Sequence, residues 1–267
     1  MIAGTTVDAV SVLTGWGAGV RALPASAATA AAGRTVIALG RPELEGERFR
    51  RATRECLLGV AAVDALLRDN GISREVIKGS ETALVYVTGG AYGASNRAWV
   101  AADTPRPAVA GTLHFPYTAP SVMSGEVAIE FGLTGPYGIL IGGAAATIDG
   151  LWQATRLLES GRCERALVLA VETFEDCAEL FARGRWLVGR PLVEAAVCAL
   201  LIRGAQRTRY DAPRVPSALE TLARTRAGET LACGPLIALA LGREDGAVGS
   251  IGVTGEWRGR RAGLYWH

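Results

Sequence analysis

The chain has 267 residues, 49% of them hydrophobic and 20% charged, and a formal net charge of +2. A chain of this length and hydrophobic content can bury a sizeable core, which excludes an intrinsically disordered protein, and its interspersed charges argue against a nucleic-acid-binding surface. No apolar stretch reaches the roughly 18 residues of a membrane-spanning helix and the N-terminus lacks a signal-peptide pattern, so we expect a cytoplasmic protein with no membrane partner.

Strand-like and helix-like segments alternate along the first ninety or so residues. The clearest is a helix over residues 46–69, whose apolar side chains recur at helical spacing and whose end is marked by Asn70-Gly71. The other segments are short apolar runs bounded by glycines, which is typical of buried strands. The expected elements are strands over 7–14, 35–39 and 83–87, a glycine-rich turn over 15–19, and the helix over 46–69.

A long loop rich in aromatic residues and prolines follows the strand at 83–87. Loops of this length are usually functional or disordered, and the aromatic residues argue against disorder. Regular alternation then resumes. The expected elements are helices over 121–131 and 145–160, a helical turn near 175–182, and strands over 137–141, 165–171 and 193–202.

The last part of the chain is more polar. Residues 205–220 contain prolines and indicate a linker, and the basic stretch 257–261 is interpreted as part of a tail. Between them we expect helices over 216–226 and 231–241 and a strand over 247–254. Strands that alternate with helices predict an α/β layered fold with a mostly parallel sheet.

The titratable residues offer few catalytic candidates. The five cysteines lack metal-type CxxC spacing, and Cys56, Cys198 and Cys233 lie in apolar patterns, where cysteine acts as a small hydrophobe. Cys177 has no base nearby in the pattern, which argues against a nucleophile. We interpret the acidic cluster that begins at Glu172 as a solvated turn. We therefore expect a reduced protein with no metal and no cofactor.

Three segments carry motif-like patterns. Residues 125–136 form a helix followed by Gly-Leu-Thr-Gly-Pro, residues 159–172 form a small turn and a strand that ends in glutamate, and residues 194–201 form an apolar strand. In this order and spacing, over residues 7 to 204, the chain resembles the β-ketoacyl synthases of the thiolase superfamily. The resemblance implies a thiolase-like layered α/β fold, essentially the N-terminal ketosynthase half with a short C-terminal extension.

The position of the family's nucleophile is the most informative departure from this resemblance. In the family, Gly-Pro is followed by an apolar strand, two small residues and the active cysteine. Counting nine residues on from Gly135 places Ala144 at that position, after Gly142-Gly143. Alanine has no thiol to form a thioester, so the covalent route of condensation is not available to it. The resemblance therefore implies a partner without a catalytic residue rather than an enzyme.

The remainder of the family's catalytic apparatus is also missing. In the family, the catalytic histidines and a glycine-rich loop of the oxyanion hole lie in a second thiolase half. Only 63 residues follow residue 204, and the two histidines, His114 and His267, lie in no such motif. We expect residues 1–204 to form a ketosynthase N-terminal-like domain, and residues 205–267 to form a linker and a short extension packed on the same domain.

A narrower resemblance concerns short ketosynthase-like subunits that lack the cysteine. Such subunits are described as chain-length factors and occur beside active ketosynthases in polyene and aryl-polyene type pathways, and residues 233–240 resemble their C-terminal ending. This resemblance implies a heterodimer with an active ketosynthase subunit. It also implies an encounter with an acyl carrier protein that bears a phosphopantetheine-linked acyl chain.

The same resemblance implies roles for two groups of residues. The region 111–125 resembles the segment that reaches into the partner's acyl tunnel, and an aromatic side chain there stops elongation by excluded volume. The residues of the tunnel gate are then His114, Phe115, Tyr117 and Met123. The strand that pairs across the dimer axis in the superfamily corresponds here to Tyr137, Ile139, Leu140 and Ile141. Packing of Phe115 and Met123 in the chain's own core is the competing interpretation.

Two alternative functions stay open at this stage. The first is an enzyme, either a malonyl-carrier-protein decarboxylase or an acyltransferase of the same superfamily. Decarboxylating relatives place glutamine at the nucleophile position, where this chain has Ala144. The second alternative is a scaffold that binds the carrier protein and has no influence on chain length. A homodimer of the isolated chain also stays open, because the strand that forms the dimer in the superfamily is self-complementary.

Overall fold

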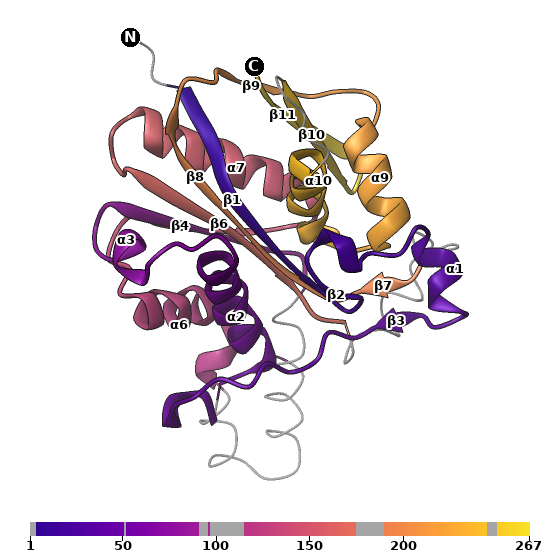
Figure 1. Ribbon diagram of the computed structural model, residues 1–267, viewed down its shortest axis with the longest axis horizontal. Helices are drawn as coiled ribbons and strands as arrows, with labels where there is room; N and C mark the ends of the chain where they lie inside the picture. The colour runs from indigo at the N-terminus through magenta and orange to yellow at the C-terminus, as the bar shows by residue number, and fades with distance from the viewer. Residues whose placement is uncertain (1–3, 51, 91–95, 97–114, 175–189, 245–249) are drawn as a thin grey trace.

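A six-stranded sheet forms the centre of the molecule (Figure 1). The computed structural model describes residues 4–50, 52–90, 96, 115–174, 190–244 and 250–267. In spatial order the strands are β2 (Gly17–Ala18), β1 (Gly4–Thr14), β8 (Ala195–Gly204), β6 (Arg165–Glu172), β4 (Thr82–Thr88) and β5 (Tyr137–Ile141). The strand predicted over 193–202 is divided at Glu194 into β7 (Leu192–Val193) and β8. A short parallel pair joins β7 to β3 (Val36–Ile37) beside the main sheet.

The strand directions make this a mixed sheet. β4 runs parallel to both β5 and β6, whereas β8 runs antiparallel to β6, and β1 runs antiparallel to β8 and to β2. The expectation of a mostly parallel sheet is therefore wrong for the half of the sheet that contains β1 and β8. Periodicity within one strand reports which residues are buried but carries no information on the direction of the neighbouring strand.

Helices cover both faces of this sheet. On one face lie α2 (Arg54–Asp69), α6 (Ser121–Phe131) and the short α3 (Arg74–Ile77), and on the other lie α7 (Ala144–Glu159), α9 (Ala218–Ala227) and α10 (Gly234–Glu244). Successive side chains of β4 point to opposite faces of the sheet. Leu84 and Tyr86 pack in the cluster with α2, and Val85 and Val87 pack in the cluster with α7. Because both faces of the sheet are covered, β4 is buried at every position, including Thr82 and Thr88 at its two ends.

Local sequence signals place several elements well. α6 and β5 have the predicted bounds, and α6 ends at Gly132, whose φ of 65° lies in the left-handed region that favours glycine. α2 begins at Arg54, not at residue 46, after a 3-10 turn, η2 (Glu47–Arg50). Phe49 lies outside the helix but is buried in the same cluster as α2. Because its spacing matches the apolar pattern of α2, the sequence predicted a helix that began too early.

The C-terminal segment contains structure that the sequence did not indicate. β9 (Thr208–Asp211) lies inside the predicted linker and pairs with β11 (Arg260–Trp266), which in turn pairs with β10 (Ile251–Trp257). The basic stretch interpreted as a tail is instead the hairpin between β10 and β11. Its two loop residues, Arg258 and Gly259, have φ of 51° and 82°, as a two-residue primed turn requires.

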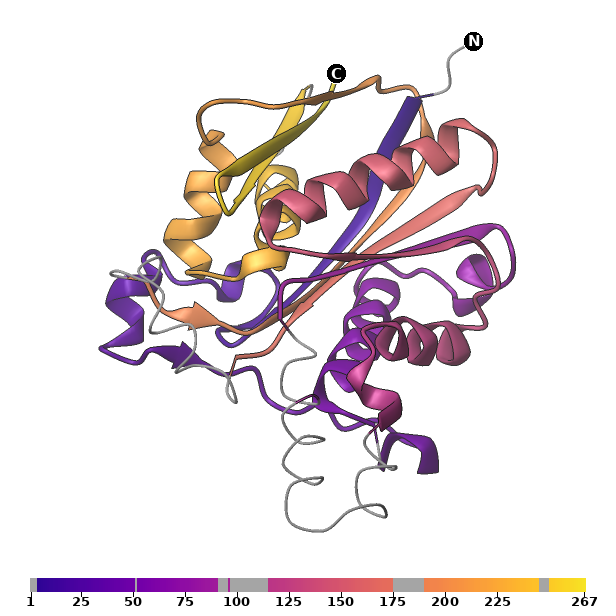
Figure 2. The ribbon, with the colours of Figure 1, turned by 180° about the vertical axis from the view of Figure 1, so that it is seen from behind.

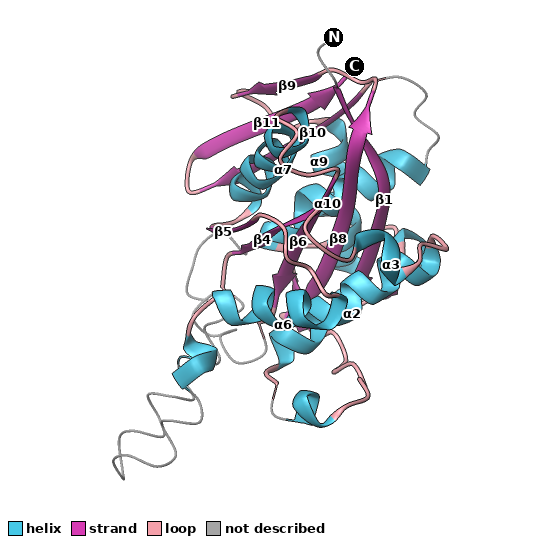
Figure 3. Ribbon diagram, turned by 90° about the vertical axis from the view of Figure 1, so that its left-hand side faces the viewer, coloured by secondary structure: helices cyan, strands magenta, loops and turns pink. Residues whose placement is uncertain are grey.

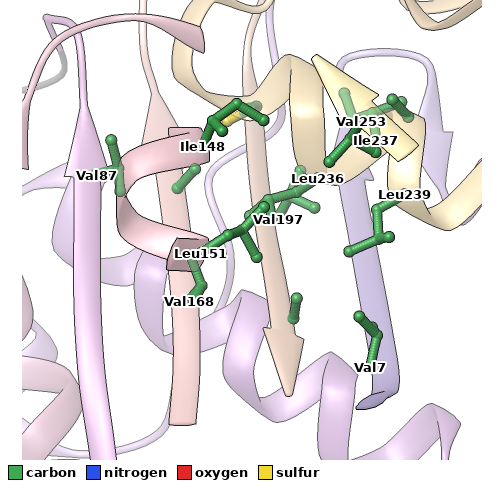
Figure 4. Close-up of a cluster of buried hydrophobic side chains, with 14 of the residues drawn as sticks. Val7, Val87, Ile148, Leu151, Val168, Val197, Leu236, Ile237, Leu239 and Val253 are labelled. Atoms are coloured by element: carbon green, nitrogen blue, oxygen red, sulfur yellow. The ribbon is translucent and has the colours of Figure 1, made fainter. Parts of the chain in front are cut away.

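This C-terminal sheet shares a hydrophobic cluster with the central sheet. Val253, Leu264 and Trp266 lie in one cluster with α7, α10 and β1, and the Trp266 indole nitrogen donates to Thr5 Oγ1 at 3.3 Å. Figure 4 shows part of this cluster, including Val7 and Leu236. The division of the chain into two domains at residue 204 stays a prediction.

Four further short elements complete the description: η1 (Val20–Ala22), α1 (Ala27–Ala31), η3 (Phe115–Thr118) and η5 (Leu231–Cys233). The helical turn predicted near 175–182 and most of the long aromatic loop lie outside the described residues. Within the described ranges, none of the helices has both the length and the apolar character needed to cross a membrane.

Candidate functional site

The turn that resembles the nucleophile position joins the edge strand β5 to helix α7. Gly142 and Gly143 form the turn, and Ala144 is the first residue of α7. The Gly142 amide donates to the Thr88 carbonyl at 2.8 Å, which holds the turn against the end of β4. Ala144 is 8% exposed and therefore buried at the helix N-terminus. The helix geometry expected from the sequence is present, without a nucleophilic side chain.

Strand β10 packs directly against this turn. A Cβ atom added to Gly143 would lie 2.1 Å from Cε3 of Trp257, so the indole lies on the bare backbone of the glycine. A Cβ atom added to Gly255 would lie 2.9 Å from the Ala144 Cβ. Figure 2 shows α7 lying beside the C-terminal strands. β10 therefore packs against Ala144 through Gly255 and against the preceding Gly143 through Trp257.

The first turn of α7 is also tied to the C-terminal segment. The Thr147 hydroxyl donates to the Ala232 carbonyl at 2.6 Å, and both residues are buried. Cys233, the next residue, places its Sγ 3.4 Å from the Ala195 carbonyl oxygen. Burial raises the pKa of the Cys233 thiol well above its ordinary value. This cysteine is therefore a protonated packing residue and not a thiolate nucleophile.

The other described cysteines have the same character. Burial raises the pKa of Cys56 to about 12 and also raises the pKa values of Cys163 and Cys198. All four described cysteines are free and buried. Cys177 lies outside the described residues. Within the described ranges, no group of acidic, histidine and cysteine side chains is arranged to hold a metal ion.

Glu172 is a buried residue that the sequence interpretation missed. Its carboxylate accepts from the Gly89 amide at 2.5 Å, the Gly90 amide at 3.1 Å and the Ala232 amide at 3.2 Å. Burial raises its pKa to about 8, and these hydrogen bonds oppose the rise. The interpretation of Glu172 as part of a solvated turn is wrong, because the side chain joins β4, β6 and the segment at Ala232 beneath the glycine turn.

A second buried carboxylate, Glu194, lies at the break between β7 and β8. Its Oε1 lies 3.0 Å from Nη1 of Arg54, and it accepts from the amides of Leu39 and Phe174 at 2.8 and 2.7 Å. Arg54 is the first residue of α2, so the ion pair connects that helix to the break between β7 and β8. The glutamate that interrupts an apolar run was the available sequence signal for a buried ion pair.

The strand expected to pair across a dimer axis forms an open edge of the central sheet. β5 pairs with β4 on one side and has no strand partner on the other side within the described residues (Figure 3). Tyr137 is 72% exposed and Ile141 is 56% exposed, and Ile129 on α6 is 70% exposed. Ile139 and Leu140 are half-buried, each against one of the two core layers. An apolar edge strand of this kind is a template for pairing with another chain.

The four expected gate residues have different surroundings. Met123 is buried in the chain's own core, where a Cβ atom added to Gly59 of α2 would lie 2.4 Å from its Sδ. Tyr117 is half-buried against the same cluster, and Phe115 lies in η3. His114 lies outside the described residues. The contacts of Met123 match the competing interpretation of a packing residue, and the gate itself stays a prediction.

Comparison with known proteins identifies the family. Residues 38–188 match the model of the N-terminal domain of β-ketoacyl synthases. No curated protein matches the chain by sequence. Among solved structures, the ishigamide ketosynthase/chain length factor is similar with a TM-score of 0.77 and 17% identity, over 98% of each chain.

Two further structures have the same fold. A type II polyketide synthase acyl-carrier protein complex with its ketosynthase matches with a TM-score of 0.75 and 12% identity, over 100% of this chain and 99% of that chain. The complex of a ketosynthase with its chain length factor from Xenorhabdus doucetiae matches with a TM-score of 0.64 and 14% identity, over 99% of each chain. The thiolase-like layered fold expected from the motifs is thereby confirmed, and since the family model covers more than half of the sequence, the chain belongs to the β-ketoacyl synthase family.

Proposed function

We propose that the chain is a non-catalytic partner of an active β-ketoacyl synthase, of the chain-length-factor type, in polyketide, polyene or fatty-acid-like biosynthesis. This proposal rests on the turn formed by Gly142 and Gly143, where the family has its nucleophile. Ala144 stands where the family has its cysteine, and Trp257 and Gly255 of β10 pack onto the turn. A site without a thiol, covered by the chain's own strand, is suited to structure rather than to acyl transfer.

The open edge of β5 supports a heterodimer. Its unpaired backbone groups and the exposed side chains of Tyr137 and Ile141 would be covered by the matching strand of an active ketosynthase. Two of the structurally similar proteins are named as ketosynthases with a chain length factor, and a third contains an acyl-carrier protein with its ketosynthase. An acyl carrier protein with a phosphopantetheine-linked chain is accordingly the proposed third component.

Heterodimer formation is tested by isolating the chain from its native host. Co-eluting proteins would be identified by mass spectrometry, and the complex sized by light scattering. We expect a stoichiometric ketosynthase with an intact cysteine. A lone monomer or a homodimer would contradict the proposal, and turnover of malonyl-carrier protein by the isolated chain would favour the decarboxylase alternative.

Ile141→Arg in the co-expressed pair tests the role of β5. The charged side chain would lie within the proposed apolar interface, at the end of β5, so we expect loss of the co-purified ketosynthase. Val215→Arg is a matched control, because Val215 is 69% exposed and lies outside β5 and α6. Equal recovery of the partner with both variants would contradict an interface at β5.

The influence on chain length is tested by product analysis of the reconstituted pair. Phe115→Ala and Tyr117→Ala are expected to lengthen the acyl products, because each removes volume from the proposed end of the tunnel. Val76→Ala on α3 is a control, since Val76 is exposed on a different helix. Met123→Ala is less informative, because it also opens a cavity in the chain's own core. Unchanged product lengths in both aromatic variants would favour the scaffold alternative.

A further inference from the structure

The C-terminal sheet ends on one side in the short strand β9. The strand order is β10, β11, β9, and within the described residues no strand pairs with the outer edge of β9. β9 lies at the upper margin of the molecule in Figure 3. It belongs to a different sheet from β5, so the outer edges of β9 and β5 are separate surfaces.

The hydrogen-bond pattern shows which backbone groups of β9 point outward. Arg207 and His267 exchange both of their backbone bonds, at 3.1 and 2.9 Å, directly before the ladder between β9 and β11. Bonded and non-bonded pairs alternate along an antiparallel ladder, so every second residue after Arg207 also bonds to β11. The amides and carbonyls of the residues between them, Thr208 and Tyr210, therefore point away from β11 toward the outer edge.

Side chains on the inner face of β9 fix the strand against α7 and the β10–β11 hairpin. The Tyr210 hydroxyl donates to Asp149 Oδ1 at 2.6 Å and accepts from Arg260 Nη2 at 2.8 Å. Thr208 Oγ1 lies 3.4 Å from Glu159 Oε1, near the end of α7. The strand is therefore held extended before a partner binds, which reduces the entropy lost on association.

The outer face of β9 carries two opposite charges on either side of Tyr210. The Arg209 side chain is 61% exposed and that of Asp211 is 46% exposed, and Arg209 Nη1 lies 3.4 Å from Asp211 Oδ2. The Arg209 guanidinium also lies 5.0 Å from the centroid of the Tyr265 ring. This order is self-complementary, because an antiparallel pair of two copies centred on Tyr210 places each Arg209 opposite Asp211 of the other copy.

We propose that β9 pairs antiparallel with β9 of a second copy of this chain, about a two-fold axis at Tyr210. Tyr210 then exchanges its outward backbone bonds with Tyr210 of the second copy. The adjacent pairs of Arg209 with Asp211 are of the non-bonded kind, in which opposite side chains lie closest. The two C-terminal sheets become continuous across the axis, and this pairing does not depend on a ketosynthase bound at β5.

The length and the charges of β9 limit its partners. Charged side chains on a short edge strand oppose pairing with unrelated strands. A parallel copy in register would bring Arg209 beside Arg209, whereas the antiparallel copy brings opposite charges together. β9 has four residues, so the buried surface is small and we expect a weak dimer that depends on concentration.

Sedimentation velocity of the full chain over a series of concentrations tests this pairing, in an Ile141→Arg background that opposes association at β5. Arg209→Asp places an aspartate opposite Asp211, so we expect dimerisation to weaken about tenfold or more. Arg68→Asp is the matched control, because the Arg68 side chain is 65% exposed on α2 and the change of charge is the same. A monomer at every concentration in the background, or equal dimerisation of the two variants, would overturn the proposal.

A mixture of two variants separates the interface from an effect on folding. Asp211→Arg alone places an arginine opposite Arg209 and is also expected to weaken dimerisation. When it is mixed with Arg209→Asp, every cross-strand pair again has opposite charges, so we expect the mixture to form dimers at concentrations where neither variant does so alone. Thermal unfolding establishes that both variants are folded. A mixture of the two folded variants that stays monomeric would overturn the proposal.

Discussion

At the scale of single residues, position 144 decides the chemistry available to the chain. A helix N-terminus lowers the pKa of a cysteine and favours its thiolate, so this geometry would activate a thiol. Ala144 supplies none, it is buried, and β10 packs against it through Gly255 and against Gly143 through Trp257. We therefore expect that a restored thiol alone would not admit an acyl chain.

Ala144→Cys is therefore expected to leave the chain unacylated. Incubation with an acyl-carrier protein donor, followed by intact-mass analysis, would show no added acyl group, and iodoacetamide labelling at this position would be slow. Ser160→Cys, at the exposed C-terminal end of α7, is the control that we expect to label readily. A stable acyl adduct on Cys at position 144 would contradict the covered site.

Titration of Glu172 makes the free energy of unfolding depend on pH. Its pKa is raised from 4.5 to about 8, mainly by burial. Between these two pH values the folded chain binds more protons than the unfolded chain, so this residue lowers the free energy of unfolding as the pH rises. Its stabilising contribution is complete below pH 4.5 and is lost as the pH passes through about 8.

Glu172→Gln tests this dependence. A glutamine stays neutral, so the unfolding free energy of the variant, relative to the natural chain, should increase as the pH rises from 4.5 to 8. Urea denaturation at a series of pH values measures the difference. Glu75→Gln, on the exposed side of α3, should change little over the same range. A difference for Glu172→Gln that does not vary with pH would show that the carboxylate is ionised throughout.

At the scale of elements, the buried ion pair of Arg54 and Glu194 joins the start of α2 to the break between β7 and β8. Removal of one partner leaves the other charge buried without compensation. Arg54→Met is expected to lower the free energy of unfolding by about 3–5 kcal/mol. Arg68→Met, at the exposed end of the same helix, should change it by less than about 0.5 kcal/mol. Denaturant unfolding of both variants provides the comparison, and equal effects would contradict a structural role for the pair.

The elements also differ in how far local sequence predicts them. β4, β5, α6 and α7 were predicted to within a residue or two, because each is bounded by a glycine turn and has a clear pattern of apolar residues. β9 and β11 were missed, whereas the strand expected over 247–254 overlaps β10. β9 has only four residues, and it becomes a strand through pairing with β11, which lies some fifty residues further along the chain.

At the scale of the whole molecule, the C-terminal segment completes the core above α7. Val253, Leu264 and Trp266 belong to the same buried cluster as side chains of the central sheet and α7. Leu264→Ala is expected to lower the free energy of unfolding by about 2–5 kcal/mol, since it opens a cavity in this shared core. Val215→Ala, in the exposed segment before α9, should have little effect. A small effect of Leu264→Ala would show that the C-terminal sheet is only loosely attached.

The sequence by itself determined the family, the α/β character of the fold and the alanine at the nucleophile position, because these depend on local motifs and on residue identity at a counted spacing. Only the tertiary structure decided that β10 packs against this position and that Glu172 is buried rather than solvated. The reason is that burial, strand direction and the convergence of charges depend on contacts between remote residues, on which the periodicity of a single segment carries no information.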